Sequence, residues 1–138
     1  MSLEEENKNI VRRYQEIYNS NALDALREVV AEDLRTPKIM PGIPSGIEGA
    51  KVAHQMMLAG FPDYQTIIDD LIAEDDKVVA RITMSGTNTG SFMGIPPTGK
   101  HVSFTGIYIA RIANAKIVEH WGEEDGVSLL QQLGVLSL

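Results

Sequence analysis

The chain has 138 residues, a formal net charge of −7 and no cysteine. This length predicts one domain, residues 1–138, that can bury a core and enclose a small cavity but is too short for two domains. The lack of cysteine excludes disulfides, thiolate chemistry and cysteine-ligated metal, and it agrees with a cytoplasmic protein.

Charge and hydropathy argue against two classes of partner. The twelve basic residues are scattered along the chain, so the sequence has no electrostatic footprint for nucleic acid. No apolar run approaches the roughly 20 residues needed to cross a bilayer. The first six residues are largely acidic, and they lack both the basic and the apolar region of a secretory signal. We therefore expect neither a nucleic-acid nor a membrane partner.

The first half of the sequence has helical periodicity. Its spacing predicts three helices, over about residues 4–20, 22–33 and 46–59. The first helix has an acidic first turn, which complements the helix dipole, and an apolar face that includes Tyr14 and Tyr18. The second is brief. The third follows a segment punctuated by proline and glycine and is closed by a glycine.

The apolar period changes to two after residue 63. Four strands are predicted, over about residues 64–73, 77–89, 101–113 and 116–124, and the tail 125–134 has the pattern of a short helix. Helices followed by strands indicate an α+β fold. We expect a cone-shaped barrel in which three N-terminal helices pack against a curved antiparallel sheet of four or more strands. The C-terminal helix should cover an edge or the mouth of that sheet.

Four segments of the second half carry a family resemblance. They are the Gly-Ile-Pro-Pro-Thr-Gly-Lys turn at 94–100, the strand segments 106–112 and 116–121, and the Leu-Leu-Gln-Gln-Leu-Gly ending at 129–134. Their spacing resembles the polyketide cyclase-like (ester cyclase) branch of the nuclear-transport-factor-2-like superfamily, over nearly the whole chain. The resemblance implies the cone fold and a pocket for a small molecule. Because this fold hosts many functions, the function has to be argued from the site.

The resemblance implies that the last long strand carries the chemistry. In cyclases of this branch a carboxylate lies two residues after a histidine, on the same strand face, and moves protons during an intramolecular aldol closure. His120 matches the histidine, but Gly122 stands where the carboxylate is expected. The remaining acidic candidates are Glu124, on the same face, and Asp125, which also fits the N-cap of the last helix. The candidate catalytic residues are therefore His120, Glu124 and Asp125.

Six further residues are candidates for substrate binding. Tyr108 and Tyr14 fall near positions of polar pocket groups in the related isomerases and cyclases, although each also fits an ordinary half-buried tyrosine. Thr36 stands near the isomerase base, and threonine is no base at neutral pH. Phe92 and Met93 either line the mouth of the cone or belong to the core. The six candidates are Tyr14, Tyr18, Thr36, Phe92, Met93 and Tyr108.

Other chemistries have weaker support. Epoxide hydrolysis in this superfamily needs two carboxylates and an arginine around one water, which Asp69, Asp70 and Arg81 would have to supply. A cross-strand ion pair on the wet face of the sheet is the simpler interpretation of these three residues. The three histidines have no ligand spacing, so we expect neither a metal site nor a cofactor.

These observations lead to one functional hypothesis and its rivals. The first is cofactor-free acid/base chemistry of the intramolecular aldol type on a small apolar carbonyl compound in a conical pocket. The main rival is a non-catalytic binder of a small apolar molecule, because Gly122 and Thr36 cannot transfer protons. A related isomerase or hydrolase, and a purely structural dimerisation module, remain further alternatives.

The sequence also predicts a homodimer. The two-residue period of a strand places Trp121 on the face opposite to His120, so Trp121 fits a core or an interface better than a substrate platform. Ile107 and Ile109 of the neighbouring predicted strand are also available to cover that face. An apolar sheet face without helices needs cover, and a second copy of the chain would supply it.

Overall fold

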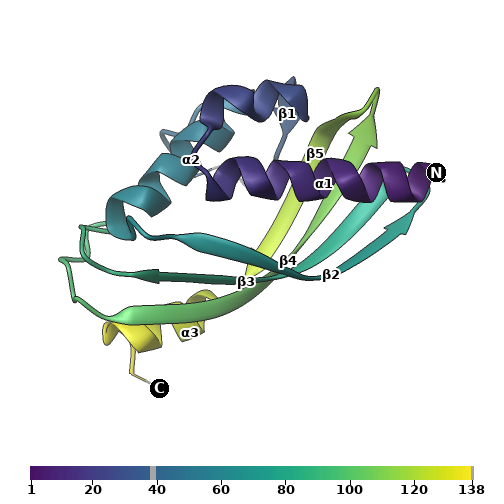
Figure 1. The fold of residues 1–138 in the computed structure, drawn as a ribbon. Helices are drawn as coiled ribbons and strands as arrows, with labels where there is room; N and C mark the ends of the chain where they lie inside the picture. Colours follow the sequence, from purple (N-terminus) through teal and green to yellow (C-terminus); the bar gives the residue numbers. More distant parts are fainter. Residues whose placement is uncertain (38–39, 138) are drawn as a thin grey trace.

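The computed structural model describes residues 1–37 and 40–137 (Figure 1). In chain order its elements are α1 (Leu3–Asn19), the 3-10 helix η1 (Leu23–Glu28), β1 (Val30–Arg35), α2 (Gly46–Gly60), β2 (Gln65–Glu74), β3 (Lys77–Thr87), β4 (His101–Ala113), β5 (Lys116–Glu124) and α3 (Gly126–Leu133). The strands form one sheet in the order β1-β5-β4-β3-β2. The strands β2 to β5 pair antiparallel, whereas β1 pairs parallel with β5. The predicted α+β cone fold is confirmed.

The segment between α1 and α2 corrects one prediction. Residues 30–35 form the strand β1, although their spacing predicted a helix to about residue 33, and the helix before them is a six-residue 3-10 helix. Residues 30–35 form a strand because they pair with the free edge of β5, whose backbone groups need hydrogen-bond partners. At the start of this pairing the N–H of Ile117 donates to the carbonyl of Val29 at 2.7 Å. The pairing overrides the weak local preference of these residues for a helix.

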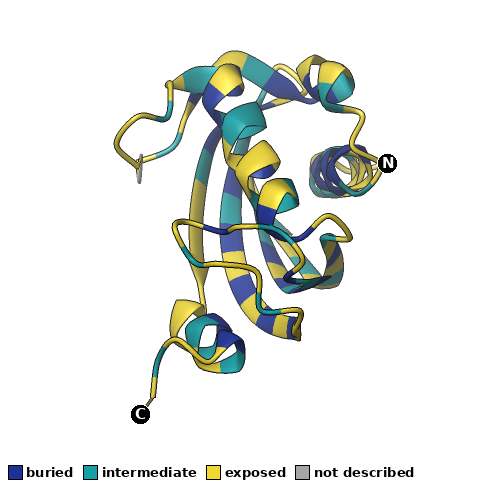
Figure 2. Cartoon of the chain, turned by 90° about the vertical axis from the view of Figure 1, so that its left-hand side faces the viewer, coloured by how far each residue is buried: buried dark blue, intermediate teal, exposed yellow. Residues whose placement is uncertain are grey.

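The concave side of the sheet holds most of the core. Figure 1 shows α1 lying across this side, with α2 beside the C-terminal end of α1. The apolar face of α1 meets alternate residues of the strands, so that Val11, Ile17, Val78 and Ile117 are almost completely buried. Figure 2 shows the same alternation as bands of buried and exposed residues along the strands. The first helix therefore fills one side of the cone and leaves room for a cavity beside it.

The C-terminal helix α3 covers an exposed stretch of β4. Asp125 caps this helix, because its carboxylate accepts a hydrogen bond from the backbone N–H of Ser128 at 3.0 Å. The side chain of Gln132 forms two hydrogen bonds to the backbone of Ser103, at 2.8 and 2.9 Å, as a neighbouring strand would. The predicted short helix over an edge of the sheet is confirmed.

The long connection between β3 and β4 is tied down by Asn88, which has no exposed surface. Its side-chain amide donates to the carbonyls of Gly60 and Gly90, and its side-chain oxygen accepts from the backbone N–H and the hydroxyl of Thr98. Phe92 of this loop packs against Phe61, with ring centroids 5.1 Å apart. The loop is a closed structural unit at one end of the cone.

Candidate active site

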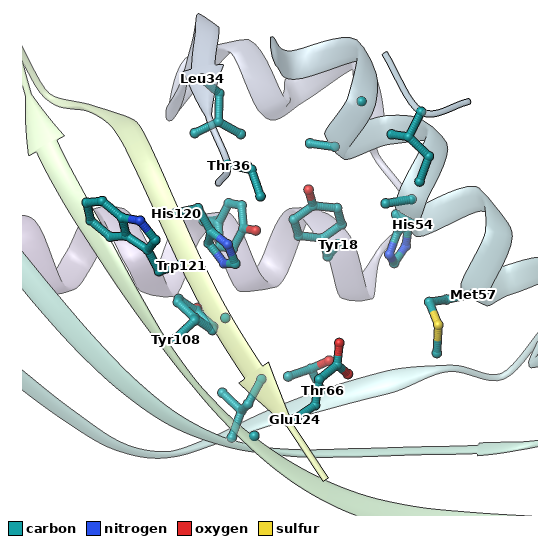
Figure 3. A pocket seen from close by; sticks show the side chains of 18 of the residues that line it. Tyr18, Leu34, Thr36, His54, Met57, Thr66, Tyr108, His120, Trp121 and Glu124 are labelled. Atoms are coloured by element: carbon teal, nitrogen blue, oxygen red, sulfur yellow. The ribbon is translucent and has the colours of Figure 1, made fainter. Parts of the chain in front are cut away.

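A cavity of about 530 Å³ lies between the concave face of the sheet and the helices α1 and α2 (Figure 3). This volume is typical of a small-molecule site. The wall contributed by α2 is mostly apolar, and most of the polar groups come from α1 and from the sheet. Of the nine candidate residues from the sequence, six line the cavity: Tyr14, Tyr18, Thr36, Tyr108, His120 and Glu124.

The other three candidates lie outside the described lining. Asp125 has turned away to cap α3, so the capping alternative describes its position. Phe92 is buried against Phe61 in the connection between β3 and β4, and it belongs to the core. Met93 follows at a left-handed backbone position, with φ of 48°, and 60% of its surface is exposed. The loop tied by Asn88 thus holds Phe92 in the core and leaves Met93 on the surface, whereas Asp125 is held at the start of α3.

The strand β5 positions the chemical groups. The side-chain alternation of β5 places His120, Gly122 and Glu124 on the concave face. In the register of β5 with β4 these residues lie opposite Ala110, Tyr108 and Gly106, respectively. Two of these facing residues are small, which keeps the floor of the cavity open. Gly122 itself leaves a recess between His120 and Glu124, because a Cβ there would meet nothing closer than 3.5 Å.

His120 lies among aromatic rings rather than charges. Its ring centroid is 4.7 Å from that of Tyr108 and 6.0 Å from that of Tyr14. Burial lowers the pKa of His120 to about 4, and a hydrogen bond to its own backbone opposes part of this shift. The imidazole is therefore neutral at pH 7. With one nitrogen protonated, the other offers a lone pair that can accept a proton.

Glu124 experiences the opposite shift. Burial raises the pKa of its carboxyl group above the usual range for glutamate. Figure 3 shows this carboxyl group beside Thr66 and pointing into the cavity. The same strand face thus carries a histidine that is kept in its basic form and a glutamate that is shifted toward its acid form.

Tyrosine hydroxyls supply most of the remaining polar surface. The Tyr108 hydroxyl donates to the side-chain oxygen of Gln15 at 3.1 Å, and both groups are buried. Tyr14 and Tyr18 touch edge to face at 4.7 Å and share a hydrogen bond between their hydroxyls. Burial raises the pKa of all three phenols, so each stays protonated and can donate a hydrogen bond.

Sequence reasoning missed several polar residues of the lining, among them Gln15, His54 and Tyr64. A signal was present for two of them. Gln15 falls within the buried stripe of α1, four residues after Val11, and His54 falls within the apolar stripe of α2, three residues before Met57. A polar residue inside an apolar helical stripe indicates a buried partner or a cavity. Tyr64 precedes β2 and carries no such pattern.

Trp121 and the arginine of β3 lie away from the floor of the cavity. Figure 3 shows Trp121 on the opposite side of β5 from His120, as predicted, although it also contributes to the rim of the lining where the edge of β5 is open. Arg81 pairs across the strands with Asp70 at 2.8 Å and Asp69 at 3.8 Å. The cross-strand ion pair is confirmed. This trio does not line the cavity, so the structure offers no support for the epoxide-hydrolase alternative.

Within the described residues, no group of three or more His, Cys, Asp or Glu side chains is placed to hold a metal ion. None of the described helices is long and apolar enough to cross a membrane. The polar inventory of the cavity therefore consists of imidazole, carboxyl, phenol, hydroxyl and amide groups. These are the groups of acid/base chemistry and hydrogen bonding.

A curved sheet that wraps a long N-terminal helix around a pocket defines a cone fold of the nuclear-transport-factor-2-like type. Residues 8–133 match the model of the SnoaL-like polyketide cyclase family, and the chain belongs to that family. Two curated relatives are each 26% identical over 129 residues, covering 91% of this chain. They are the aklanonic acid methyl ester cyclases DauD of Streptomyces sp. (strain C5) and DnrD of Streptomyces peucetius, of which 80% and 88% are covered.

Solved structures agree with this assignment. TsrD from Streptomyces laurentii is 31% identical with a TM-score of 0.89, covering 99% of this chain and 100% of TsrD. IdmH from Streptomyces antibioticus is 34% identical with a TM-score of 0.82, covering 94% of this chain and 99% of IdmH. The fold and the family are thereby shown. The roles of the individual residues in the cavity are a separate matter.

Proposed function

We propose that the chain is a cofactor-free cyclase that closes a ring in a small apolar carbonyl compound by an intramolecular aldol reaction. The observation that carries this proposal is the pair His120 and Glu124. Both face the same cavity from β5, and burial shifts their pKa values in opposite senses. Two titratable groups whose environments shift their pKa values in opposite directions can serve as the base and the acid of one reaction.

The reaction needs one base and one acid. His120, neutral and with a free lone pair, removes a proton from a carbon next to a carbonyl group. The resulting enolate carbon forms a bond to a second carbonyl carbon of the same molecule, and the oxygen of that carbonyl takes a proton from the carboxyl group of Glu124. The proton on His120 returns to Glu124 through solvent at the open side of the cavity. No atom is gained or lost, so no redox partner is needed.

The aromatic surroundings support this assignment. Tyr108 and Tyr14 border the imidazole with their rings, and this apolar contact keeps His120 in its neutral, basic form. Gly122 leaves space between the two catalytic groups. A flat ring system of the substrate fits this recess against the strand. Thr36 and Tyr18 would complete the binding surface at the other walls.

Turnover assays test the proposal. The curated relatives are named for aklanonic acid methyl ester, so this ester is the first substrate to try. His120→Ala and Glu124→Gln should each lower kcat by about 10²- to 10⁴-fold, the usual contribution of a general acid or base. His101→Ala and Glu74→Gln, at exposed positions of β4 and β2, are matched controls and should retain activity. Full activity in both site variants would overturn the assignment.

A second candidate function is a non-catalytic binder of a small apolar molecule. Gly122, at the position where the family resemblance implies a carboxylate, favours it. A binder would retain the ester without converting it, and its affinity would survive in the Glu124→Gln variant. Liquid chromatography with mass spectrometry of the bound ester after prolonged incubation separates the two functions, because ring closure gives an isomer of the same mass with a different retention time.

We also propose that the domain functions as a homodimer. Register aligns four apolar residues in one row across the outer face of the sheet: Ile72, Val79, Ile109 and Trp121. Ile72 is 65% exposed, and Ile107 in the next row is 50% exposed. A row of this kind is the surface that a second copy would bury.

We further propose that residues 1–138 form one domain and that the protein is cytoplasmic. The continuous core from α1 to α3 supports the single domain, and the cysteine-free sequence supports the cytoplasmic location.

A further inference from the structure

One end of the cavity is built from three polar residues that the proposed reaction does not use in proton transfer: Tyr18 of α1, His54 of α2 and Tyr64 before β2. Their rings are in contact. The centroid of His54 is 4.6 Å from that of Tyr18 and 6.1 Å from that of Tyr64. Figure 3 shows Tyr18 between His120 and His54, with His54 on the side remote from His120. We call this cluster the tyrosine end.

The tyrosine end is fixed from behind. A ring nitrogen of His54 is hydrogen-bonded to the side-chain oxygen of Asn21 at 3.2 Å. Burial lowers the pKa of His54, so the ring is neutral at pH 7 and adds no charge. The imidazole therefore acts as a packed spacer, and it holds the two phenol rings on either side of it.

Each phenol hydroxyl of the tyrosine end shares a hydrogen bond with one neighbouring hydroxyl. Burial raises the pKa of Tyr18 to about 12, and the hydrogen bond that Tyr18 shares with Tyr14 opposes part of this rise. Burial likewise raises the pKa of Tyr64 to about 12, and the hydrogen bond that Tyr64 shares with Thr66 opposes part of it. Both phenols are thus protonated at neutral pH.

Two hydroxyl groups that share one hydrogen bond use one of their two protons, so each of these pairs keeps one proton to donate. Among the hydrogen bonds of residues 1–37 and 40–137, none runs from the hydroxyl of Tyr18 or Tyr64 to a group outside its pair, and both residues line the cavity. The nearby wall from α2 is apolar, with Ala53 and Met57. A donor that faces an apolar cavity favours a ligand that brings an acceptor oxygen.

We propose that Tyr18 and Tyr64 form a second polar subsite that binds a carbonyl or ether oxygen of the ligand through two hydroxyl donors, with His54 as the positioning residue between them. This inference deepens the proposed function, because it assigns how the substrate is oriented relative to His120. The ligand class it defines is a compound with an acceptor oxygen at the end remote from the reacting carbon.

Binding of two matched probes tests the subsite. 2-Acetylnaphthalene carries one acceptor oxygen, and 2-ethylnaphthalene has a similar outline without it. The ketone has a single carbonyl group and cannot close a ring by itself, so the test does not depend on turnover. We expect calorimetric titration of the wild-type chain to give a lower Kd for the ketone. Equal affinities for both probes would overturn the proposal while leaving the cyclase proposal intact.

Conservative variants locate the donors. Tyr18→Phe and Tyr64→Phe should each weaken binding of the ketone by about three- to tenfold and leave the hydrocarbon within about twofold. Ketone with a ¹³C-labelled carbonyl group gives a second readout, because its resonance should move toward the free-probe position when a donor is lost. Equal loss for both probes, or an unchanged resonance, would show that the rings act through packing and would overturn the subsite. His120→Ala is the counterpart that should abolish turnover and keep the ketone preference.

Discussion

A Cβ atom placed on Gly122 would lie 3.5 Å from Cε1 of His120, an ordinary van der Waals distance. The backbone of Gly122 is outside the left-handed region, so a larger residue is not strained there. Position 122 is therefore open to the carboxylate that the family resemblance implies. Glu124, two residues further along the same face, occupies the nearest acidic position that this sequence retains.

Gly122→Asp tests this relationship directly. The variant should fold, as monitored by circular dichroism, and the new carboxylate should raise the pKa of His120 from about 4 because it stabilises the imidazolium. A proton NMR titration of the His120 ring measures that pKa. Gly122→Asn has the same size without charge and should leave the pKa near its wild-type value. If both variants give the same pKa, the carboxylate does not face the imidazole.

The pH dependence of stability follows from the same histidine. An unfolded histidine has a pKa near 6.5, and His120 has a folded pKa of about 4, so the unfolded chain binds more protons between these values. Stability is therefore complete above about pH 6.5 and falls as pH drops toward 4, by on the order of 3 kcal/mol. Urea unfolding at a series of pH values measures the slope.

His120→Gln is the control for that slope. It should reduce the loss of stability between pH 6.5 and 4 without removing it, because burial also lowers the pKa of His54. Glu124 acts in the other direction. Because the pKa of Glu124 is raised in the folded chain, its contribution to the free energy of unfolding is complete at low pH and is lost as the pH rises through the folded pKa. Glu124→Gln should thus gain stability relative to wild type at neutral pH. An unchanged slope in His120→Gln would contradict the assigned pKa.

The sequence identified most of the fold, and the failures have physical causes. Period two between residues 64 and 124 predicted four strands, and helical periodicity before and after that segment predicted the helices α1, α2 and α3. The strand β1 was missed because its pairing with β5 is a long-range interaction that its own residues do not encode. Within the site, His120 was identified from the family resemblance, and Glu124 from the alternation of the strand that carries His120. His54 was missed because its partners Asn21 and Tyr18 are 33 or more residues away in the chain.

The rate of the proposed reaction should depend on pH in a bell shape. kcat/KM should rise through about pH 4 as His120 loses its proton, and it should fall again above the usual range of glutamate as Glu124 ionises. The maximum is expected at mildly acidic pH. Turnover of the methyl ester between pH 3.5 and 8 measures the profile. In the Glu124→Gln variant the residual kcat/KM should no longer fall on the alkaline side of the profile. If that fall remained, the general acid would be another group.

The outer row of the sheet predicts the oligomeric state. Light scattering at micromolar concentration should give about 30 kDa, twice the chain mass of 15.1 kDa. The double variant Ile72→Lys with Ile107→Lys should yield a folded monomer. It should fold because the two side chains are 65% and 50% exposed in the single chain, and it should not associate because a dimer would bury the new lysines. Val127→Lys, on α3 and 49% exposed, is the matched control and should remain dimeric. A wild-type mass of about 15 kDa, or dimers of the double variant, would exclude this face as the interface.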